Sequence, residues 1–385
     1  MLSVRKYWLR LFTALMILGV VSSPLAAVES TVRCEKEYRK IIAAEEKVRR
    51  EVELRQQGKW PRPVSTSEEH LLTDLHERVW PWYNDSNHHG YFEGAGGAQI
   101  FYRRFVLPPS KEKGAVVISH GFAESSSKWA EMAFNLNENG YSVYIFDHRG
   151  HGRSEKLAEN PRMVHVDRFS NYVGDLDTFI EKVVKSDDFA GRKKHLLGFS
   201  MGGAIATLYD SRNPETFDKV VLGAPMLKIR FSVFPHWLAS AVLKVGRMFR
   251  NEKHYALGVS DSFAAEPAFK NNIMTGSRTR FLAKRLRFNL DDTVPQGGPS
   301  FGWLAEAMWG AREARQSGAR IDKPVLLIQG GSDKVVSKSA QNQFCNGAPN
   351  CSKLVLESAR HDIFWEKDAI RDHMLRSMFY FLEND

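Results

Sequence analysis

The sequence predicts an α/β protein in which a mostly parallel sheet is flanked by helices and carries an inserted helical cap. Three observations support this prediction. The 385 residues are 43% apolar, which is enough to bury a large core. Short apolar runs alternate with helical stretches, as in successive strand and helix units. The alternation stops over residues 226–319, where the chain becomes helical and aromatic.

The first 27 residues have the composition of a secretory signal peptide. A basic start is followed by an apolar run from Leu11 to Val21 and a small-residue exit at residues 24–27. The apolar run is shorter than the ~20 residues that a membrane-spanning helix needs. We expect export, with the protein periplasmic or membrane-associated on the outer side of the inner membrane. An uncleaved anchor is the alternative.

Charge limits the partners of the exported chain. The formal net charge is +9, and residues 1–27 carry three positive and no negative charges, so +6 remains after cleavage. Such a surplus favours an anionic lipid surface over nucleic acid, which an exported protein rarely meets. We therefore expect a membrane surface, and no nucleic acid, among the partners.

Residues 28–89 are predicted as an N-terminal helix and linker. Residues 34–57 are dense in charge and carry apolar residues at roughly helical spacing, which indicates an amphipathic helix packed on the domain. A partner or membrane contact is the alternative for this helix. Residues 58–67 contain two prolines and are typical of a linker. The globular domain is expected to begin near Gly90, with a hairpin over residues 91–107.

The core is predicted from residues 90–225 and 320–385, on either side of the cap. Apolar runs bounded by turn residues are typical of buried strands. They lie at residues 115–119, 142–146, 195–197, 220–223, 325–329 and 353–356. Functional groups of open α/β sheets gather at the carboxyl ends of the strands, so the site is expected in the loops that follow these runs.

One serine stands in such a loop. The stretch GFSMG around Ser200 lies between an apolar run and a small-residue stretch with good helix formers. This context indicates a strand, a sharp turn and a helix, with glycines on both sides because a Cβ would crowd the turn. We predict that Ser200 is a nucleophile; a plain Gly/Ser loop is the alternative.

Two partners for Ser200 follow later strands. Asp333 comes after a predicted strand, whereas Asp322 precedes that strand and would lie at the wrong edge of the sheet. His361 follows the last predicted strand. The chain order Ser200, Asp333, His361 is that of α/β-hydrolases, in which the histidine is the base and the carboxylate orients it. A turn-forming aspartate and a packed histidine are the alternatives.

The loop SHGF leads to a further prediction. Its His120 competes with His361 for the role of base but comes too early in the chain. A turn in this loop would aim the backbone N–H of Phe122 at the serine, where it forms an oxyanion hole with the N–H of Met201. The histidines of DHRGHGRS lack a matching carboxylate or cysteine set, so no metal site is expected.

The three cysteines are unevenly spaced. Cys345 and Cys351 lie close together in CNGAPNC, while Cys34 lies alone. In an exported protein this spacing predicts a disulfide between Cys345 and Cys351, whereas zinc lacks a matching cluster.

The predicted cap carries side chains that bear on the substrate. Aromatic and aliphatic residues between 231 and 249 could line an acyl pocket or pack as a plain helix. A basic run over residues 278–287 includes Arg278 and Arg280, which are candidate contacts to a phosphate headgroup. A solvated face is the alternative for this run, and nucleic acid is the least favoured partner.

Five segments, taken in order, resemble the bacterial lysophospholipase and monoacylglycerol lipase group of α/β-hydrolases. They are SHGF, DHRGHGRS, GFSMGGAIA, GGSDKVV and SARHDIFWEKD. The cap segments NNIMTGSRTR and QGGPSFGWLAEA resemble the lysophospholipase branch more closely. The resemblance begins near Gly90 and implies an α/β-hydrolase fold. It also implies these roles: nucleophile Ser200, base His361, orienting acid Asp333, and oxyanion donors Phe122 and Met201.

Together these observations predict a serine-dependent carboxylic ester hydrolase that acts on lipid esters through an acyl-enzyme and needs no cofactor. A lysophospholipase is the first expectation, and a monoacylglycerol lipase or general carboxylesterase is the alternative. A serine peptidase or amidase on the same scaffold is less favoured. A non-catalytic lipid- or partner-binding module on a hydrolase fold is disfavoured because all three residue types of the triad are present.

Overall fold

The computed structural model describes residues 65–85, 88–187, 192–230, 253–256, 259–260, 269–290 and 297–384. Three predicted features lie outside these residues: the signal peptide, the amphipathic helix at residues 34–57, and the apolar cap residues between 231 and 249. Within the described part, no helix is long and apolar enough to cross a membrane.

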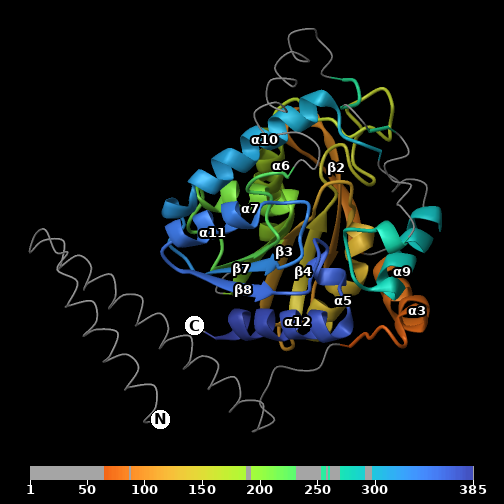
Figure 1. The fold of residues 1–385 in the computed structure, drawn as a ribbon. Coiled ribbons are helices and arrows are strands. Elements are labelled where there is room, and N and C mark those ends of the chain that lie inside the picture. Colours follow the sequence, from red (N-terminus) through yellow and green to blue (C-terminus); the bar gives the residue numbers. More distant parts are fainter. Residues whose placement is uncertain are drawn as a thin grey trace, which may run out of the picture. The chain divides into compact units, whose positions relative to one another are not determined.

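Eight strands of the described residues form one sheet, in the order β1-β2-β4-β3-β5-β6-β7-β8 (Figure 1). They are β1 (His89–Glu93), β2 (Gln99–Phe105), β3 (Gly114–Ser119), β4 (Tyr141–Phe146), β5 (Lys194–Phe199), β6 (Lys219–Gly223), β7 (Val325–Gly330) and β8 (Cys351–Leu356). β1 and β2 form the predicted hairpin, and β2 pairs antiparallel with β4. All other neighbours are parallel. The predicted mostly parallel sheet is confirmed, and every predicted strand is present.

The central strands are covered on both faces. Every residue of β3, β4 and β7 is buried. A strand covered on both faces needs a continuous apolar run rather than an alternating one. The sequences GAVVIS and VLLIQG supply such runs, which is why these strands could be located from the sequence.

Helices cover the sheet in two layers (Figure 1). On one face, α6 (Ser170–Phe179), α7 (Met201–Asp210), α10 (Phe301–Gln316) and α11 (Lys338–Gly347) share a core cluster with the sheet. On the other face, α5 (Ala130–Glu138) and α12 (Asp368–Glu383) belong to a second cluster. The sheet is therefore enclosed, and its loops at one edge are left to form a site.

The prediction that the globular domain begins near Gly90 is wrong. Residues 65–85 fold into α3 (Leu71–Asp74), a π-helical segment (Leu75–Val79) and α4 (Trp80–Asn84). An apolar residue recurs every fourth position, and these residues are buried in the same cluster as α5 and α12: Leu71, Leu75, Val79 and Tyr83. This helical stripe makes the segment part of the core, so it is not a linker.

The predicted cap at residues 226–319 is not one separate layer. In the described residues, α9 (Arg278–Leu290) lies beside α3, whereas α10 packs along α7 (Figure 1). Ala307, Ala311 and Ala314 of α10 are buried in the core cluster of α6 and α7. Small side chains on one face allow the close approach of two helices, so α10 belongs to the core.

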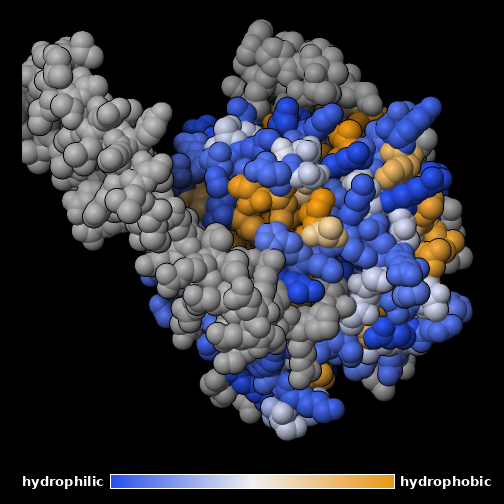
Figure 2. All heavy atoms as spheres, turned by 60° about the horizontal axis from the view of Figure 1, so that its bottom comes forward, coloured by the Kyte–Doolittle hydropathy of each residue, from blue (hydrophilic) through white to orange (hydrophobic). Residues whose placement is uncertain are grey.

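Two helices leave apolar side chains at the surface. Leu72 on α3 is 53% exposed, and Leu282 and Leu286 on α9 are 48% and 52% exposed. Figure 2 shows a mostly hydrophilic surface with apolar patches, one of them on the side where α3 and α9 lie in Figure 1. The contact between α3 and α9 therefore covers only part of their apolar surface within the described residues.

Candidate active site

Ser200 lies at the sharp turn between β5 and α7. Its φ is 52°, in the left-handed region that residues with a Cβ avoid. A Cβ on Gly202 would lie 1.9 Å from the carbonyl oxygen of Ser119, and one on Gly198 would lie 2.6 Å from that of Gly202. The glycines of GFSMG are needed because the strand, the turn and the neighbouring loop pass too close for side chains.

The structure brings Ser200, Asp333 and His361 together at the carboxyl edge of the sheet. His361 Nε2 lies 2.9 Å from Ser200 Oγ, and His361 Nδ1 lies 2.8 Å from Asp333 Oδ2. Asp333 Oδ1 accepts the N–H groups of Val335 at 2.7 Å and Val336 at 3.2 Å. With Asp333 ionised, Nδ1 carries the proton, and Nε2 can accept the proton of the serine hydroxyl.

Charge at the site suits this proton transfer. Burial alone would lower the pKa of His361, but the Asp333 carboxylate holds it above the ordinary value of 6.5, and Asp362 and Glu124 add to this effect. Burial alone would raise the pKa of Asp333, but His361 and two backbone N–H groups keep it below its ordinary value. The site therefore combines an ionised acid with a histidine of raised proton affinity, as a general base for a serine hydroxyl requires.

The predicted oxyanion residues lie on two segments that touch. Met201 is the first residue of α7, at the positive end of the helix dipole. Gly202 lies against the carbonyl group of Ser119, so the start of α7 abuts the loop that carries Phe122. The ring of Phe122 packs on Trp303 of α10, with ring centroids 4.1 Å apart. The backbone N–H groups of Phe122 and Met201 remain the predicted oxyanion donors.

His120 is engaged by backbone groups on both ring nitrogens. Nδ1 lies 2.8 Å from the carbonyl oxygen of Gly121, and Nε2 accepts the N–H of His148 at 3.0 Å. Its ring centroid lies 4.4 Å from that of His148 and 5.5 Å from that of His151, and burial lowers the pKa of all three. These neutral rings brace the loop before Phe122. Among the described residues, no group of three metal-ligating side chains could hold a metal ion.

Glu124 is a functional candidate that was not predicted from the sequence. Its Oε2 accepts the N–H of Gly121 at 2.8 Å and the indole N–H of Trp129 at 3.0 Å. Lys128 donates to its other oxygen. The carboxylate thus fixes the turn that presents Phe122. The available signal was an acidic residue two positions after Phe122, in a loop where a backbone turn needs an acceptor.

The structure forms the disulfide between Cys345 and Cys351. The two Cα atoms are 5.3 Å apart. Cys345 lies in the last turn of α11, and Cys351 is the first residue of the edge strand β8. The bond therefore closes the connection between a covering helix and the strand that precedes His361. Cys34 lies outside the described residues.

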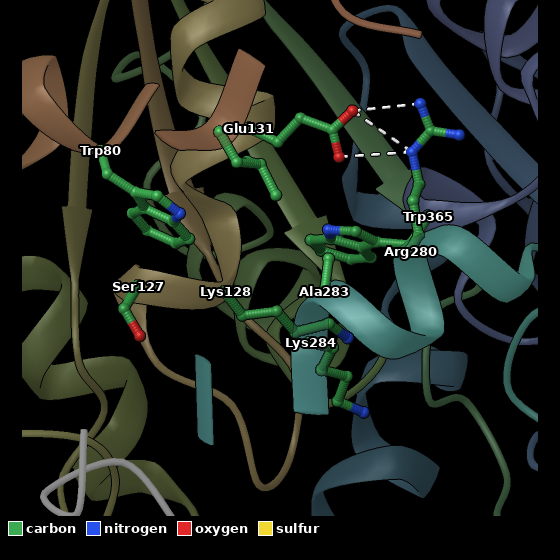
Figure 3. Close-up of a pocket in the computed structure, with 9 residues that line it drawn as sticks. Trp80, Ser127, Lys128, Glu131, Arg280, Ala283, Lys284 and Trp365 are labelled. Carbon is green, nitrogen blue, oxygen red and sulfur yellow. Dashed lines mark hydrogen bonds and ion pairs between the residues drawn. The ribbon is translucent and has the colours of Figure 1, made fainter. Parts of the chain in front are cut away.

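The prediction that Arg280 contacts a headgroup is wrong. The side chain is buried and donates from Nε and Nη2 to the Glu131 carboxylate (Figure 3). Its Nη1 lies 2.8 Å from the Glu366 carbonyl oxygen and 2.8 Å from the Asp368 carboxylate. A guanidinium in this position anchors α9 to the fold because all of its nitrogens are engaged within the protein. Arg278, by contrast, is exposed and stays a predicted contact.

Comparisons with known proteins agree with the fold. Residues 110–368 match the family Hydrolase_4, described as "Serine aminopeptidase, S33". Lysophospholipase L2 of Escherichia coli (strain K12) is 36% identical over 275 residues, which are 69% of this chain and 79% of that protein. Monoacylglycerol lipase of Mycolicibacterium smegmatis is 28% identical over 246 residues, which are 64% of this chain and 79% of that protein.

A solved structure is similar in fold. It is that of a soluble variant of monoglyceride lipase from Saccharomyces cerevisiae in complex with a substrate analog. The TM-score is 0.62 at 20% sequence identity, and the alignment covers 76% of this chain and 94% of that one. At this identity the likeness concerns the fold alone.

Proposed function

The chain belongs to the Hydrolase_4 family of serine hydrolases, and from that premise we propose that it is a lysophospholipase with Ser200 as its nucleophile. The observation that carries the proposal is the hydrogen-bonded series Ser200, His361 and Asp333. It occurs in a chain that is 36% identical to a lysophospholipase L2 over 79% of that protein.

The geometry supports a two-step ester hydrolysis. Ser200 Oγ attacks the carbonyl carbon of the ester, and His361 Nε2 takes its proton while Asp333 stabilises the imidazolium. The N–H groups of Phe122 and Met201 receive the negative charge of the tetrahedral oxygen. His361 then gives its proton to the leaving glycerol oxygen, which leaves a fatty acyl ester on Ser200.

Water completes the cycle. His361, again neutral, accepts a proton from a water molecule as this attacks the acyl carbonyl carbon. The second tetrahedral state collapses, Ser200 recovers its proton from His361, and the fatty acid leaves. Each step uses groups of this chain and water, so the proposed reaction requires no cofactor.

Monoacylglycerol is the second candidate substrate. Arg280 is buried against Glu131, so only Arg278 remains of the two arginines that favoured a phosphate headgroup over a neutral glycerol. The similarity to the monoacylglycerol lipase of Mycolicibacterium smegmatis favours the same alternative. The family description names an aminopeptidase, so a peptide amide belongs in the test as well.

A substrate panel on the purified protein tests the proposal. It includes a lysophospholipid, a monoacylglycerol, a short p-nitrophenyl ester and a peptide amide. We expect lysophospholipid to give the highest kcat/KM, and a fluorophosphonate to label Ser200. Ser200→Ala, His361→Ala and Asp333→Asn should each lower turnover by about four to six orders of magnitude while the far-UV circular dichroism is retained.

Contrary outcomes separate the candidates. A higher kcat/KM for monoacylglycerol would transfer the assignment to that substrate, and a higher value for the amide would make the protein a peptidase. Turnover by Ser200→Ala at the wild-type rate would remove the serine mechanism altogether.

We also propose export to the periplasm or to the outer side of the inner membrane. The signal-like residues 1–27 and the basic surplus support this location, and a disulfide is typical of oxidising compartments. Cell fractionation followed by N-terminal sequencing tests it. A cytosolic protein with an intact N-terminus and free thiols at Cys345 and Cys351 would contradict it.

A further inference from the structure

A cluster of buried charges lies beside the triad and takes no part in the reaction as written above. The Lys128 ammonium lies between two carboxylates: it donates to Glu124 and lies 3.1 Å from Asp362 Oδ2. The three side chains are only 3%, 4% and 1% exposed. Lys128 also lies over the ring of Trp365, 4.0 Å from the centroid. Buried charges in such contact are costly to separate, so this pairing is fixed in the folded state.

Each carboxylate belongs to a loop of the site. Glu124 holds the N–H of Gly121, one residue before the predicted oxyanion donor Phe122. Asp362 directly follows His361, and its own N–H donates to the carbonyl group of Met274 at 2.7 Å. Lys128 therefore joins the loop of the oxyanion hole to the loop of the general base through two ion pairs.

The cluster is kept from bulk water by segments outside the loops of the triad. Lys284 of α9 lies 3.9 Å from Asp362 Oδ2. Leu75 and Trp80, which precede the predicted start of the globular domain, line a pocket of about 40 Å³ with Lys128, Lys284 and Trp365 (Figure 3). Because Lys128, Glu124 and Asp362 are themselves at most 4% exposed, their charges interact through a medium of low dielectric constant.

We propose that Lys128 is a positioning residue, which holds the oxyanion loop and the His361 loop together and offsets the negative charge that faces His361. The proposal rests on the proposed function, because it takes His361 as the general base. Lys128 itself touches no reacting atom in this scheme.

The charges around His361 give the direction of the effect. Three carboxylates act on it: Asp333 after β7, Glu124 after β3 and Asp362 on its own loop. Two ammonium groups face these carboxylates: Lys128 belongs to the 3-10 helix η4 (Ser126–Trp129), and Lys284 belongs to α9. The Arg230 side chain donates to the carbonyl group of Asp333. Loss of the Lys128 charge leaves the carboxylates less compensated, so the pKa of His361 rises further and the base is protonated at higher pH.

The pH dependence of kcat/KM for a short neutral ester tests the proposal. In Lys128→Met we expect kcat to fall about ten- to a hundred-fold with little change in KM, because the oxyanion donors and the base lose their alignment. The acid limb of the profile should move up by about one pH unit. Lys128→Arg keeps the charge and should keep the limb. Lys128→Met/Asp362→Asn removes one carboxylate as well and should bring the limb back.

Lys185→Met is the matched control. Lys185 also pairs with a glutamate four residues away, Glu181, but it is exposed and lies in the extension of α6. The pH profile of Lys185→Met should therefore equal that of the wild type. If Lys128→Met lowers stability but keeps the wild-type acid limb, Lys128 serves packing alone and the proposal is wrong.

If Lys128→Met does not fold, the pH profile of Asp362→Asn tests the proposal instead. Asp362→Asn keeps the pair of Lys128 and Glu124, and it should move the acid limb down because one carboxylate no longer favours the imidazolium. An unmoved limb in Asp362→Asn would overturn the proposal. Failure of the proposed serine mechanism is distinct, since wild-type Ser200 would then resist the fluorophosphonate. A different preferred substrate would show in the substrate panel and would leave the shifts of the acid limb unchanged.

Discussion

At the scale of single residues, Ser200 keeps a backbone conformation that costs free energy. Its φ of 52° is one that glycine adopts without penalty, whereas a residue with a Cβ is strained there by on the order of 1–3 kcal/mol. The turn persists because Ser200 N–H and C=O are held by neighbouring backbone groups: the N–H donates to Gly223 and the carbonyl accepts from Met226. The strained turn directs the hydroxyl of Ser200 toward His361 Nε2.

The strain predicts an order of stability among inactive variants. Ser200→Gly should unfold at higher urea concentration than Ser200→Ala, with a free energy of unfolding greater by about 1 kcal/mol, because only glycine relieves the turn. Both variants lack the nucleophile and should be equally inactive. Equal midpoints in urea would show that the turn carries no strain.

The residue types of the triad could be predicted because each follows an apolar strand in a fixed order. Glu124 and Lys128 could not, since their role depends on contacts to Gly121 and Asp362 that no local pattern encodes. The predicted headgroup contact of Arg280 was wrong for a related reason. A basic run on a helix has the same sequence whether a given arginine faces water or, as here, a buried carboxylate.

At the scale of elements, α9 is fixed to the fold by its first turn. Arg280 joins it to Glu131 of α5 and to Asp368 at the start of α12, and Ser277 Oγ donates to Glu68. Burial alone would raise the pKa of Glu131, but Arg371 and Arg280 keep it below the ordinary value. The start of α9, which lies in the predicted cap, is therefore held by side-chain contacts beside the loop of His361.

The contacts of Arg280 predict different effects on the free energy of unfolding when Arg280 and Arg278 are replaced. Arg280→Met removes one partner of a buried ion pair and should lower the free energy of unfolding by about 3 kcal/mol. Arg278→Gln, at an exposed position, should change it by less than about 0.5 kcal/mol. Urea unfolding measures both. A stable Arg280→Met would mean that Arg371 alone satisfies Glu131.

The same pair tests the headgroup contact. Arg278→Gln should lower turnover of lysophospholipid while a short neutral ester is unaffected, if Arg278 binds phosphate as predicted. Equal rates for both substrates would make Arg278 part of a solvated face.

The disulfide is a second element-scale constraint. The closed loop between Cys345 and Cys351 is short, so the bond should contribute about 2 kcal/mol by restricting the unfolded chain. Cys345→Ala/Cys351→Ala should lower the free energy of unfolding by that amount in thermal or urea melts. Unchanged stability of the double variant relative to the oxidised protein would contradict this estimate.

Two elements were misassigned from the sequence for physical reasons. The segment at residues 65–85 follows a proline-containing stretch, which concealed the stripe of Leu71, Leu75, Val79 and Tyr83. α10 lies within a helical, aromatic region, and its sequence alone does not say which layer its face of small residues meets. Strand assignments succeeded because burial on both faces dictates composition directly.

At the scale of the whole molecule, buried neutral histidines couple the fold to pH. Burial lowers the pKa of His195, at the start of β5, to about 4. The unfolded chain binds a proton at His195 below about pH 6.5, but the folded chain does so only near pH 4. Stability is therefore lost as pH falls through this window. His120, His148 and His151 act in the same direction, while the raised pKa of His361 opposes them.

A single substitution isolates this effect. From about pH 7 to about pH 4.5 the wild type should lose on the order of 3 kcal/mol more stability than His195→Leu, because the variant has no proton to gain there. Urea titrations at both pH values measure the difference. An identical loss in both proteins would place the acid sensitivity elsewhere.

The wide separation of the triad along the chain also bears on how the protein folds. Ser200 and His361 are 161 positions apart in sequence, and they meet only after β5, β6, β7 and β8 have paired side by side. Pairings between distant segments form slowly because the intervening chain must first be closed into a loop. We therefore expect the reactivity of Ser200 toward a fluorophosphonate to appear late in refolding, after helix formation and together with the docking of the last strand.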